Sequence, residues 1–225
     1  MIINKQSIEK FLYILILAVI IVNALIRGDN LFAMISAVCG ISYTFFAGKG
    51  KPYCYIFGVI GSGFYGLISW QSAVWGNLLL YVLYYIPMQI TGFFKWKNNL
   101  KQDKSSIVKI NIELKELIII LLASVAGIML MYMALTKFGD SNPVLDSITT
   151  VFSISAMYLT VRRAIEQWLL WIAVNALSLV MWINLAVGGA KVWSTVIMWA
   201  VYLFLGIYFY FEWKKEIKSQ TDSLV

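Results

Sequence analysis

The chain has 225 residues, of which 61% are hydrophobic and only 13% are charged, with a formal net charge of +7. A soluble domain of this size would carry about twice that charged fraction, so the composition excludes an ordinary soluble fold. A run of about 20 apolar residues crosses a bilayer as a helix, which predicts an all-α polytopic membrane protein. Eight such segments are predicted, at residues 8–26, 31–48, 53–70, 74–95, 117–136, 146–162, 167–186 and 191–212.

The first apolar segment, 8–26, is predicted to stay in the protein as a helix. It is long and no small-residue cleavage site precedes Arg27, so it does not look like a cleaved signal. Cys39 and Cys54 fall inside predicted helices and are expected to be free, packed thiols without disulfide or metal-site spacing. The one sizeable polar loop, 96–116, is too short to fold alone.

The basic residues divide unevenly between the two sides of the membrane. If all eight segments cross, Arg27, Lys137 and Lys191 lie on one side and the other fifteen of the 18 lie with both termini. Because basic loops stay in the cytoplasm, both termini are predicted to be cytoplasmic. Nucleic-acid binding is not expected, since no basic stripe interleaves with exposed aromatic residues. The fifteen are Lys5, Lys10, Lys49, Lys51, Lys95, Lys97, Lys101, Lys104, Lys109, Lys115, Arg162, Arg163, Lys214, Lys215 and Lys218.

The chain contains an internal repeat, because residues 31–97 and 148–214 align without gaps at a constant offset of 117. A single joining helix, 117–136, gives both three-helix units the same orientation, so the repeat is parallel, as in some transporters. Simple duplication in a bundle without a pathway is the alternative. The predicted organisation is an N-terminal helix (1–30), the first repeat (31–97), a cytoplasmic loop and linking helix (98–147), the second repeat (148–214) and a cytoplasmic tail (215–225).

The membrane segments offer no residues for catalysis or ion coupling. The chain has no His, and all 11 acidic residues lie in loops, tails or helix ends. Proton-coupled transporters usually need an ionisable relay inside the membrane, and hydrolases need an activated nucleophile, a metal or paired carboxylates. We therefore expect no enzyme, no cofactor and no metal site, and uncoupled passage of a solute. Sodium sites built from carbonyls and hydroxyls stay open as an alternative.

Neutral polar and aromatic side chains form a stripe on the segment 167–186. Its members are spaced by 3, 4, 3 and 4 residues, so they share one face of a helix. An amide in hydrocarbon costs several kcal/mol unless it is paired, so this face must meet other helices or a ligand. The members are Trp168, Trp171, Asn175, Ser178 and Trp182.

A second stripe lies on the segment 74–95 and includes Tyr85 and Gln89. Counted from Trp96 and Trp168 as markers of the cytoplasmic boundary, Gln89 and Asn175 both lie about 10 Å deep at 1.5 Å per residue. Two amides at one depth suit a planar polar ligand, and the aromatic faces also suit a cation. Pro87 frees a backbone carbonyl in the same helix. The full stripe is Tyr81, Tyr85, Gln89, Gly92 and Trp96.

Each of these features also has a purely structural interpretation. Trp96, Trp168, Trp193 and Trp213 stand near helix ends, as residues of an interfacial aromatic belt do. Amides inside membranes often bond a neighbouring helix, and Ser and Gly often serve helix packing. The combined pattern favours a ligand site more than any member does.

The motif Trp168-x-x-Trp171-x-x-x-Asn175 resembles that of the PnuC family of bacterial vitamin transporters. The run Glu166–Trp171 also fits, as do Asp146-Ser147 and Gly92–Trp96 at corresponding helix ends. The resemblance covers most of the chain. It implies a fold like that of the SWEET sugar facilitators and uptake of nicotinamide riboside across the inner membrane. It further implies trapping of the solute by a cytoplasmic kinase.

The residues and the resemblance together predict a substrate site. Nicotinamide riboside has a cationic aromatic ring, an amide and a ribose. These groups suit the aromatic faces and neutral amides of the two stripes. A facilitator for riboflavin, thiamine or a sugar remains an alternative, as does a non-transporting membrane scaffold, and the chain is a possible homo-oligomer. The predicted substrate-binding residues are Trp171, Asn175, Ser178, Trp182, Gln89, Tyr85 and Trp168.

Overall fold

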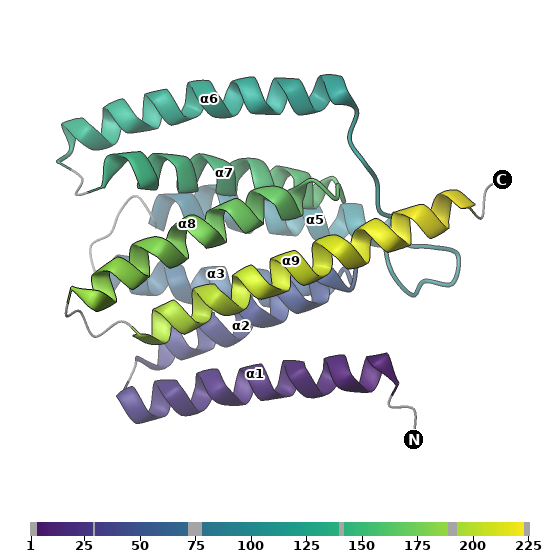
Figure 1. The fold of residues 1–225 in the computed structure, drawn as a ribbon, viewed down its shortest axis with the longest axis horizontal. Helices are drawn as coiled ribbons and strands as arrows, with labels where there is room; N and C mark the ends of the chain where they lie inside the picture. The colour runs from purple at the N-terminus through teal and green to yellow at the C-terminus, as the bar shows by residue number, and fades with distance from the viewer. Residues whose placement is uncertain (1–3, 29, 72–77, 140–141, 189–192, 223–225) are drawn as a thin grey trace. The chain divides into compact units, whose positions relative to one another are not determined.

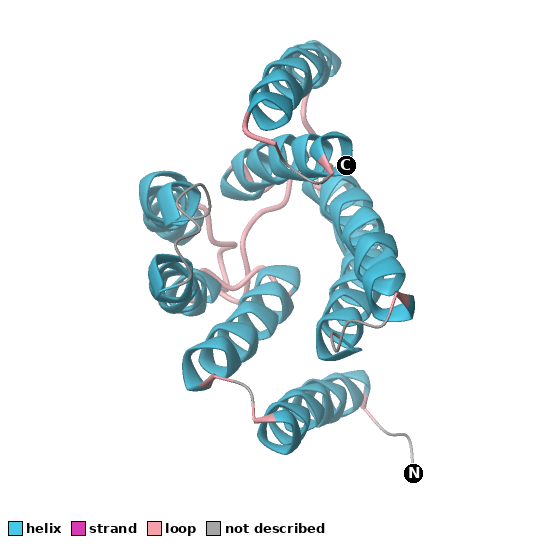
Figure 2. Cartoon of the chain, turned by 90° about the vertical axis from the view of Figure 1, so that its left-hand side faces the viewer, coloured by secondary structure: helices cyan, strands magenta, loops and turns pink. Residues whose placement is uncertain are grey.

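The computed structural model describes residues 4–28, 30–71, 78–139, 142–188 and 193–222. Within these ranges the chain forms helices joined by loops and no strand, as Figure 2 shows. Among these residues, six helices are long and apolar enough to cross a membrane, and a shorter apolar helix spans Cys54–Ile68. The predicted all-α membrane class is confirmed. The chain divides into two compact units, Met1–Phe94 and Lys95–Val225.

The first unit contains the N-terminal helix and most of the first repeat. Asn4 starts the first helix by accepting the N–H of Gln6 with its side chain, and Asn30 caps the next by accepting that of Phe32. Gly28 ends the first helix in the left-handed region, at φ 69°. The elements are α1 (Lys5–Arg27), α2 (Leu31–Gly48), α3 (Cys54–Gln71), η1 (Leu80–Tyr85) and α5 (Ile86–Lys97), of which the last three residues, 95–97, belong to the second unit.

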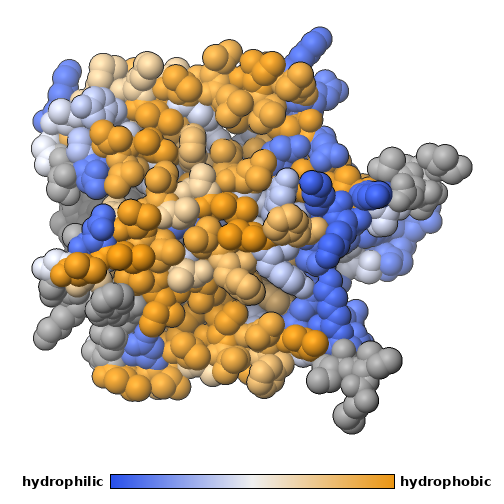
Figure 3. All heavy atoms as spheres, in the orientation of Figure 1, coloured by the Kyte–Doolittle hydropathy of each residue, from blue (hydrophilic) through white to orange (hydrophobic). Residues whose placement is uncertain are grey.

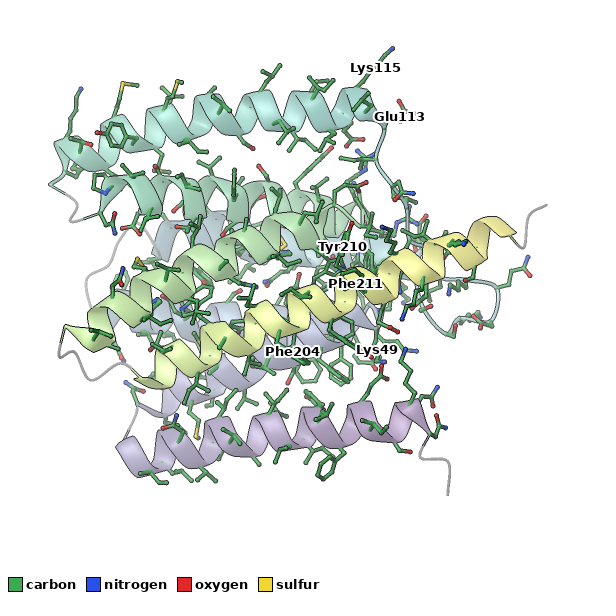
Figure 4. The ribbon with its side chains drawn as sticks, in the orientation of Figure 1. Lys49, Glu113, Lys115, Phe204, Tyr210 and Phe211 are labelled. Atoms are coloured by element: carbon green, nitrogen blue, oxygen red, sulfur yellow. The ribbon has the colours of Figure 1, made fainter. Side chains whose placement is uncertain are left out.

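The N-terminal helix α1 packs on α2 at the cytoplasmic end predicted from charge. Tyr13 and Ser42 share a hydrogen bond of 2.8 Å between their hydroxyls, and the Tyr13 ring stacks on Phe45 with centroids 4.5 Å apart. Lys49 forms an ion pair with Glu9, and Figure 4 shows Lys49 beside the beginning of α1. Although α1 lies outside the repeat, it is anchored to it by polar contacts.

Pro87 makes the predicted irregularity in its helix. Proline has no N–H and its ring crowds the carbonyl four residues earlier, so the preceding backbone must adjust. The adjustment is a π-helical turn, η1, in which the N–H of Ile86 bonds to the carbonyl of Tyr81, five residues back. Residues 74–77 of the predicted segment lie outside the described residues. The turn carries Tyr85 and leads directly into Gln89.

The second unit contains the linking helix and the second repeat. Its elements are α6 (Leu114–Lys137), α7 (Pro143–Val161), α8 (Gln167–Val187) and α9 (Trp193–Asp222). Pro143 opens α7, where its missing N–H costs nothing. Each helix packs on the next, and α8 and α9 run side by side (Figure 1). This succession fits the predicted three-helix repeat.

The last helix is longer than predicted. The segment was expected to end at residue 212, with a tail at 215–225, but α9 continues to Asp222. Residues 223–225 lie outside the described residues. The extension is polar on its outer side, with Lys214, Lys215 and Lys218 exposed. It stays helical because its inner side packs on the loop between α5 and α6. The length of the apolar run alone does not predict this packing.

The helix α6 shows the surface expected for contact with lipid. Ile119, Leu122 and Leu130 are exposed along it. In Figure 3 this helix is hydrophobic along its length and hydrophilic at both ends. Glu113 and Lys115 stand at its beginning in Figure 4. A helix of 24 residues with an exposed apolar face and charged ends is what a bilayer requires, and the chain is a multi-pass membrane protein.

The polar loop between α5 and α6 is held on the second unit; residues 98–113 are called the docked loop below. Ile110 donates its N–H to Arg163 and accepts that of Ile165, at 3.1 and 3.0 Å. Lys109, whose side chain is fully buried, lies 2.7 Å from a carboxylate oxygen of Glu216 on α9. These contacts hold the docked loop against the helices of the second unit.

Glu166, which precedes α8, adds a further contact to the docked loop. Its two carboxylate oxygens each lie 3.3 Å from the backbone nitrogen of Ile112. Burial raises the pKa of the Glu166 carboxyl, and the hydrogen bond from Ile112 acts against that shift. The loop thus meets both the corner between α7 and α8 and the end of α9.

Three tryptophans expected at the membrane boundary form a buried cluster instead. Trp96, Trp168 and Trp213 are 0, 2 and 0% exposed. The rings of Trp96 and Trp213 lie 6.2 Å apart, and those of Trp168 and Trp213 lie 5.7 Å apart. The interpretation as an interfacial belt is therefore wrong for these three, because side chains so buried do not face lipid; Lys109 of the docked loop lies over the ring of Trp213. The side chain of Trp193 lies outside the described residues.

Candidate substrate site

The stripe on α8 faces the interior of the second unit, as predicted. Asn175 and Ser178 are buried, and Trp171 and Trp182 are half-buried. On the opposite face Leu169 and Val180 are 49 and 54% exposed. Because the stripe repeats at helical spacing, all its members lie on one face of α8, which is the protected face.

Trp171 is held by a hydrogen bond from its ring nitrogen. Its indole N–H donates to the hydroxyl of Thr160 on α7, with Nε1 and Oγ1 3.1 Å apart. Trp168 differs, because its buried Nε1 has no hydrogen-bond partner in the described part of the chain. The two tryptophans of the motif therefore have different environments: one is fixed by a polar contact, and the other packs between Phe209 and Trp213.

Asn175 lies opposite a glycine of the next helix. A Cβ on Gly206 of α9 would stand 3.8 Å from Asn175 Nδ2 and 3.2 Å from Ile172. No hydrogen bond of the Asn175 side chain to another described residue is found. The amide therefore keeps hydrogen-bonding capacity that a ligand could use.

Gln89 is the buried amide of the first unit. Its amide nitrogen and oxygen lie 3.1 and 3.3 Å from the hydroxyl of Ser62 on α3, and both residues are buried. A Cβ on Gly58 would stand 3.0 Å from Gln89 Cδ and 2.9 Å from Tyr43. The structural interpretation, in which Gln89 bonds a neighbouring helix, is correct, although the amide keeps further hydrogen-bonding capacity.

Aromatic side chains of α3 and η1 contact one another in the unit that contains Gln89. The rings of Tyr65 and Tyr81 stack at 4.4 Å, and Tyr85 follows Tyr81 at 4.9 Å. Tyr85 is buried, as the inward face predicted. A Cβ on Gly92 would stand only 2.4 Å from the ring of Tyr55, so Gly92 is the residue that lets α3 and α5 approach here.

At two pairs of equivalent positions, one repeat has an amide residue where the other has a glycine. At the offset of 117 residues, Asn175 corresponds to Gly58, and Gln89 corresponds to Gly206. In each unit the amide of one helix faces the glycine of its neighbour. In each repeat the amide therefore faces the position that corresponds to the amide of the other repeat, and the equal depth of Gln89 and Asn175 stays a prediction.

The site residues carry no formal charge. The seven predicted residues form two groups: Tyr85 and Gln89 in the first unit, and the five of the α8 stripe in the second. No group of three His, Cys, Asp or Glu that could hold a metal occurs in the described residues. The chemistry available is hydrogen bonding by amides and hydroxyls, and contact with ring faces.

Several residues near the site were not predicted. The sequence did not predict these five residues near the site: Ser62, Thr160, Gly58, Gly206 and Tyr43, which lies beside Gly58. The repeat offset contains the signal for the glycines, since it pairs each of them with an amide. The roles of Ser62 and Thr160 depend on contacts between helices, which no spacing within one helix reveals.

Known proteins resemble the chain over both units. A family model described as Nicotinamide mononucleotide transporter matches residues 30–215. The nicotinamide riboside transporter PnuC of Haemophilus influenzae is 34% identical over 84% of this chain and 82% of that protein. The protein of the same name from Neisseria mucosa is 33% identical over 86% and 75%. A solved structure, the crystal structure of the vitamin B3 transporter PnuC, is 29% identical with a TM-score of 0.81, covering 96% of this chain and 94% of that one.

Proposed function

The chain belongs to the nicotinamide mononucleotide transporter family, the PnuC family suggested by its motif, and we propose that it carries nicotinamide riboside across the bacterial inner membrane. Its relatives are named as transporters, which agrees with the expected absence of enzymatic chemistry. The observation that carries the choice of substrate is the uncharged site, in which buried amides lie among aromatic rings. Membership of the family alone leaves the phosphorylation state of the solute open.

The riboside fits this site better than the mononucleotide does. A phosphate carries one to two negative charges and is normally bound by Arg, Lys or helix N-termini. The stripes on α8 and α5 place no basic residue beside Asn175 or Gln89, since the nearest Lys and Arg are at helix ends. The pyridinium ring of the riboside is cationic and flat. Such a ring gains about 0.5–2 kcal/mol over an aromatic face.

We assign roles to the predicted site residues on the same basis. Trp171 offers its ring face to the pyridinium, and Asn175 bonds the carboxamide or the ribose hydroxyls. Gln89 and Tyr85 supply the equivalent amide and ring of the first repeat. Ser178 and Trp182 line the deeper part of α8, and Trp168 supports Trp171 from the cytoplasmic end.

The proposed mechanism is facilitated diffusion by alternating access, without a coupling ion. The parallel repeat supports it, because two similar halves can exchange conformations, and so does the presence of one amide in each repeat. Net uptake then requires a sink, which phosphorylation by a cytoplasmic kinase provides. Both termini lie in the cytoplasm, consistent with Lys and Arg gathering on that side.

A binding isotherm on the purified protein tests the substrate. Nicotinamide riboside is expected to bind, and nicotinamide mononucleotide, riboflavin and thiamine are expected to bind at least about tenfold more weakly, a difference of about 1.4 kcal/mol. Binding of riboflavin or thiamine without a response to the riboside would overturn the assignment. A scaffold without a pathway would bind none of the four.

The variant Asn175→Leu tests the site. Loss of a hydrogen bond and insertion of an apolar group are expected to weaken binding of the riboside by about tenfold or more, with normal membrane insertion. Asn184→Leu is the matched control, because Asn184 is exposed on the same helix. Equal affinity of the two variants would show that Asn175 serves helix packing only.

A further inference from the structure

Thr160 occupies a junction between the candidate site and the tryptophan cluster. It lies in the last turn of α7 and is 1% exposed. Its hydroxyl accepts the indole N–H of Trp171 at 3.1 Å, and its backbone carbonyl accepts that of Trp96 at 2.8 Å. One residue therefore receives two indole donors through two different atoms.

The hydroxyl of Thr160 is itself fixed in direction. It donates its proton to the carbonyl of Ala156 at 2.8 Å, which leaves its lone pairs for Trp171. A β-branched side chain in a helix has few χ1 rotamers, so the acceptor cannot swing away. A hydrogen bond from Nε1 to a fixed acceptor restricts how the indole plane can turn. That plane is the surface that Trp171 offers to a flat ligand.

The equivalent position in the first repeat also lies behind the polar site. Thr160 corresponds to Tyr43 at the offset of 117. The Tyr43 ring lies 2.9 Å from where a Cβ of Gly58 would stand, and Gln89 Cδ lies 3.0 Å from the same point. In the first repeat this position lies close to Gln89, and in the second it bonds Trp171, which is one helical turn before Asn175 on α8.

We propose that Thr160 is a positioning residue of the substrate site, which acts through Trp171 by fixing the orientation of its indole ring. The inference rests on the proposed function only in that Trp171 contacts the substrate. If Thr160 had a purely structural role, it would only hold Trp96 and the end of α7. Its substitution would then change substrate affinity by the same factor whether or not Trp171 is present.

Two substitutions separate these roles. Thr160→Val keeps the shape of the side chain and removes the acceptor, whereas Thr160→Ser keeps the hydroxyl. Both retain the backbone carbonyl that bonds Trp96. Thr160→Val is expected to raise the Kd for nicotinamide riboside about 3- to 10-fold, the effect of one lost hydrogen bond, and Thr160→Ser to restore most of it.

A double-mutant cycle identifies the route of the effect. In the Trp171→Phe background, which has no indole N–H, Thr160→Val is expected to produce no further loss of affinity. The same loss in both backgrounds would overturn the proposal in favour of a structural role, and so would an unchanged Kd in the Thr160→Val protein.

The indole resonances provide a reading that needs no ligand. In protein labelled with ¹⁵N at the indole nitrogens, the Trp171 signal is assigned by its disappearance in Trp171→Phe. It is expected to shift in Thr160→Val and to stay in place in Thr160→Ser. If the wild type binds no nicotinamide riboside, the proposed function fails, and the positioning role is decided by this resonance alone. An unmoved Trp171 signal in Thr160→Val would overturn it.

Discussion

Within each unit, glycines let side chains of the candidate site lie close to the backbone of a neighbouring helix. Gly58, Gly92 and Gly206 each leave room in which a Cβ would meet a neighbouring helix, and Gly92 leaves the least. Small residues at helix interfaces are a general means of close packing in membranes, where burial of apolar surface supplies little driving force. Here a buried side chain of one helix also lies next to the backbone of a neighbouring helix. It is a tyrosine at Gly92 and an amide at Gly58 and Gly206.

Gly92→Ala is expected to destabilise the protein by roughly 1–3 kcal/mol, because its Cβ would stand 2.4 Å from the buried Tyr55 ring. The intrinsic gain of Ala over Gly in a helix, at most about 1 kcal/mol, is smaller than this clash. Gly63→Ala on α3 is the control, since nothing lies within 4 Å of its Cβ. Thermal unfolding in detergent measures both, and equal melting temperatures would contradict the expectation.

The face of each stripe was predictable at the residue scale, and its partners were not. Spacings of three and four residues define one side of a helix whatever surrounds it, so the burial of Asn175 and Ser178 followed from sequence. The bond between Trp171 and Thr160 joins two helices at an angle and a rotation that no local pattern encodes. The glycines opposite the two amides were predictable in part. Applying the offset of 117 residues to Asn175 and Gln89 gives Gly58 and Gly206.

At the scale of elements, the docked loop was the least predictable part. It is polar and contains no regular element, so composition assigns it to solvent. Its order comes from single long-range contacts, such as Ile110 with Arg163 and Ile165, and from the buried Lys109. The same contacts explain why α9 continues past the membrane, since Glu216 and Gln220 bind the loop from its extension.

Glu216→Gln is expected to lower stability more than Lys109→Met does. The first change removes the carboxylate charge 2.7 Å from a fully buried ammonium, which costs roughly 1–3 kcal/mol. The second removes the buried charge itself and keeps the apolar stem, while Glu216 retains Lys101 at 3.3 Å.

The double variant Lys109→Met/Glu216→Gln is expected to unfold at a higher temperature than Glu216→Gln alone, because no buried charge is left without its carboxylate. Lys215→Met is the control, as Lys215 pairs with Glu212 at an exposed position of the same helix and should have almost no effect. Additive losses in the double variant would show that Lys109 and Glu216 do not stabilise each other.

At the scale of the whole molecule, the distribution of charge bears on energy coupling. The charged residues are found at helix ends, as in the Glu9–Lys49 and Arg162–Glu116 ion pairs. The described helices place neutral groups at the level of Asn175 and Gln89. A proton-driven carrier needs a group that changes charge within its pathway, and the residues assigned to the site provide none.

Proteoliposomes that contain the purified protein should therefore equilibrate nicotinamide riboside and never concentrate it under an imposed proton or sodium gradient. Radiolabelled riboside is expected to reach the same internal and external concentration, at a rate that Asn175→Leu lowers and Asn184→Leu does not. Addition of a riboside kinase and ATP inside the vesicles should raise total internal label above that level, because the site offers no basic residue to bind the phosphate of the product. Accumulation driven by a gradient alone would contradict facilitated diffusion and would require an ion site of carbonyls and hydroxyls.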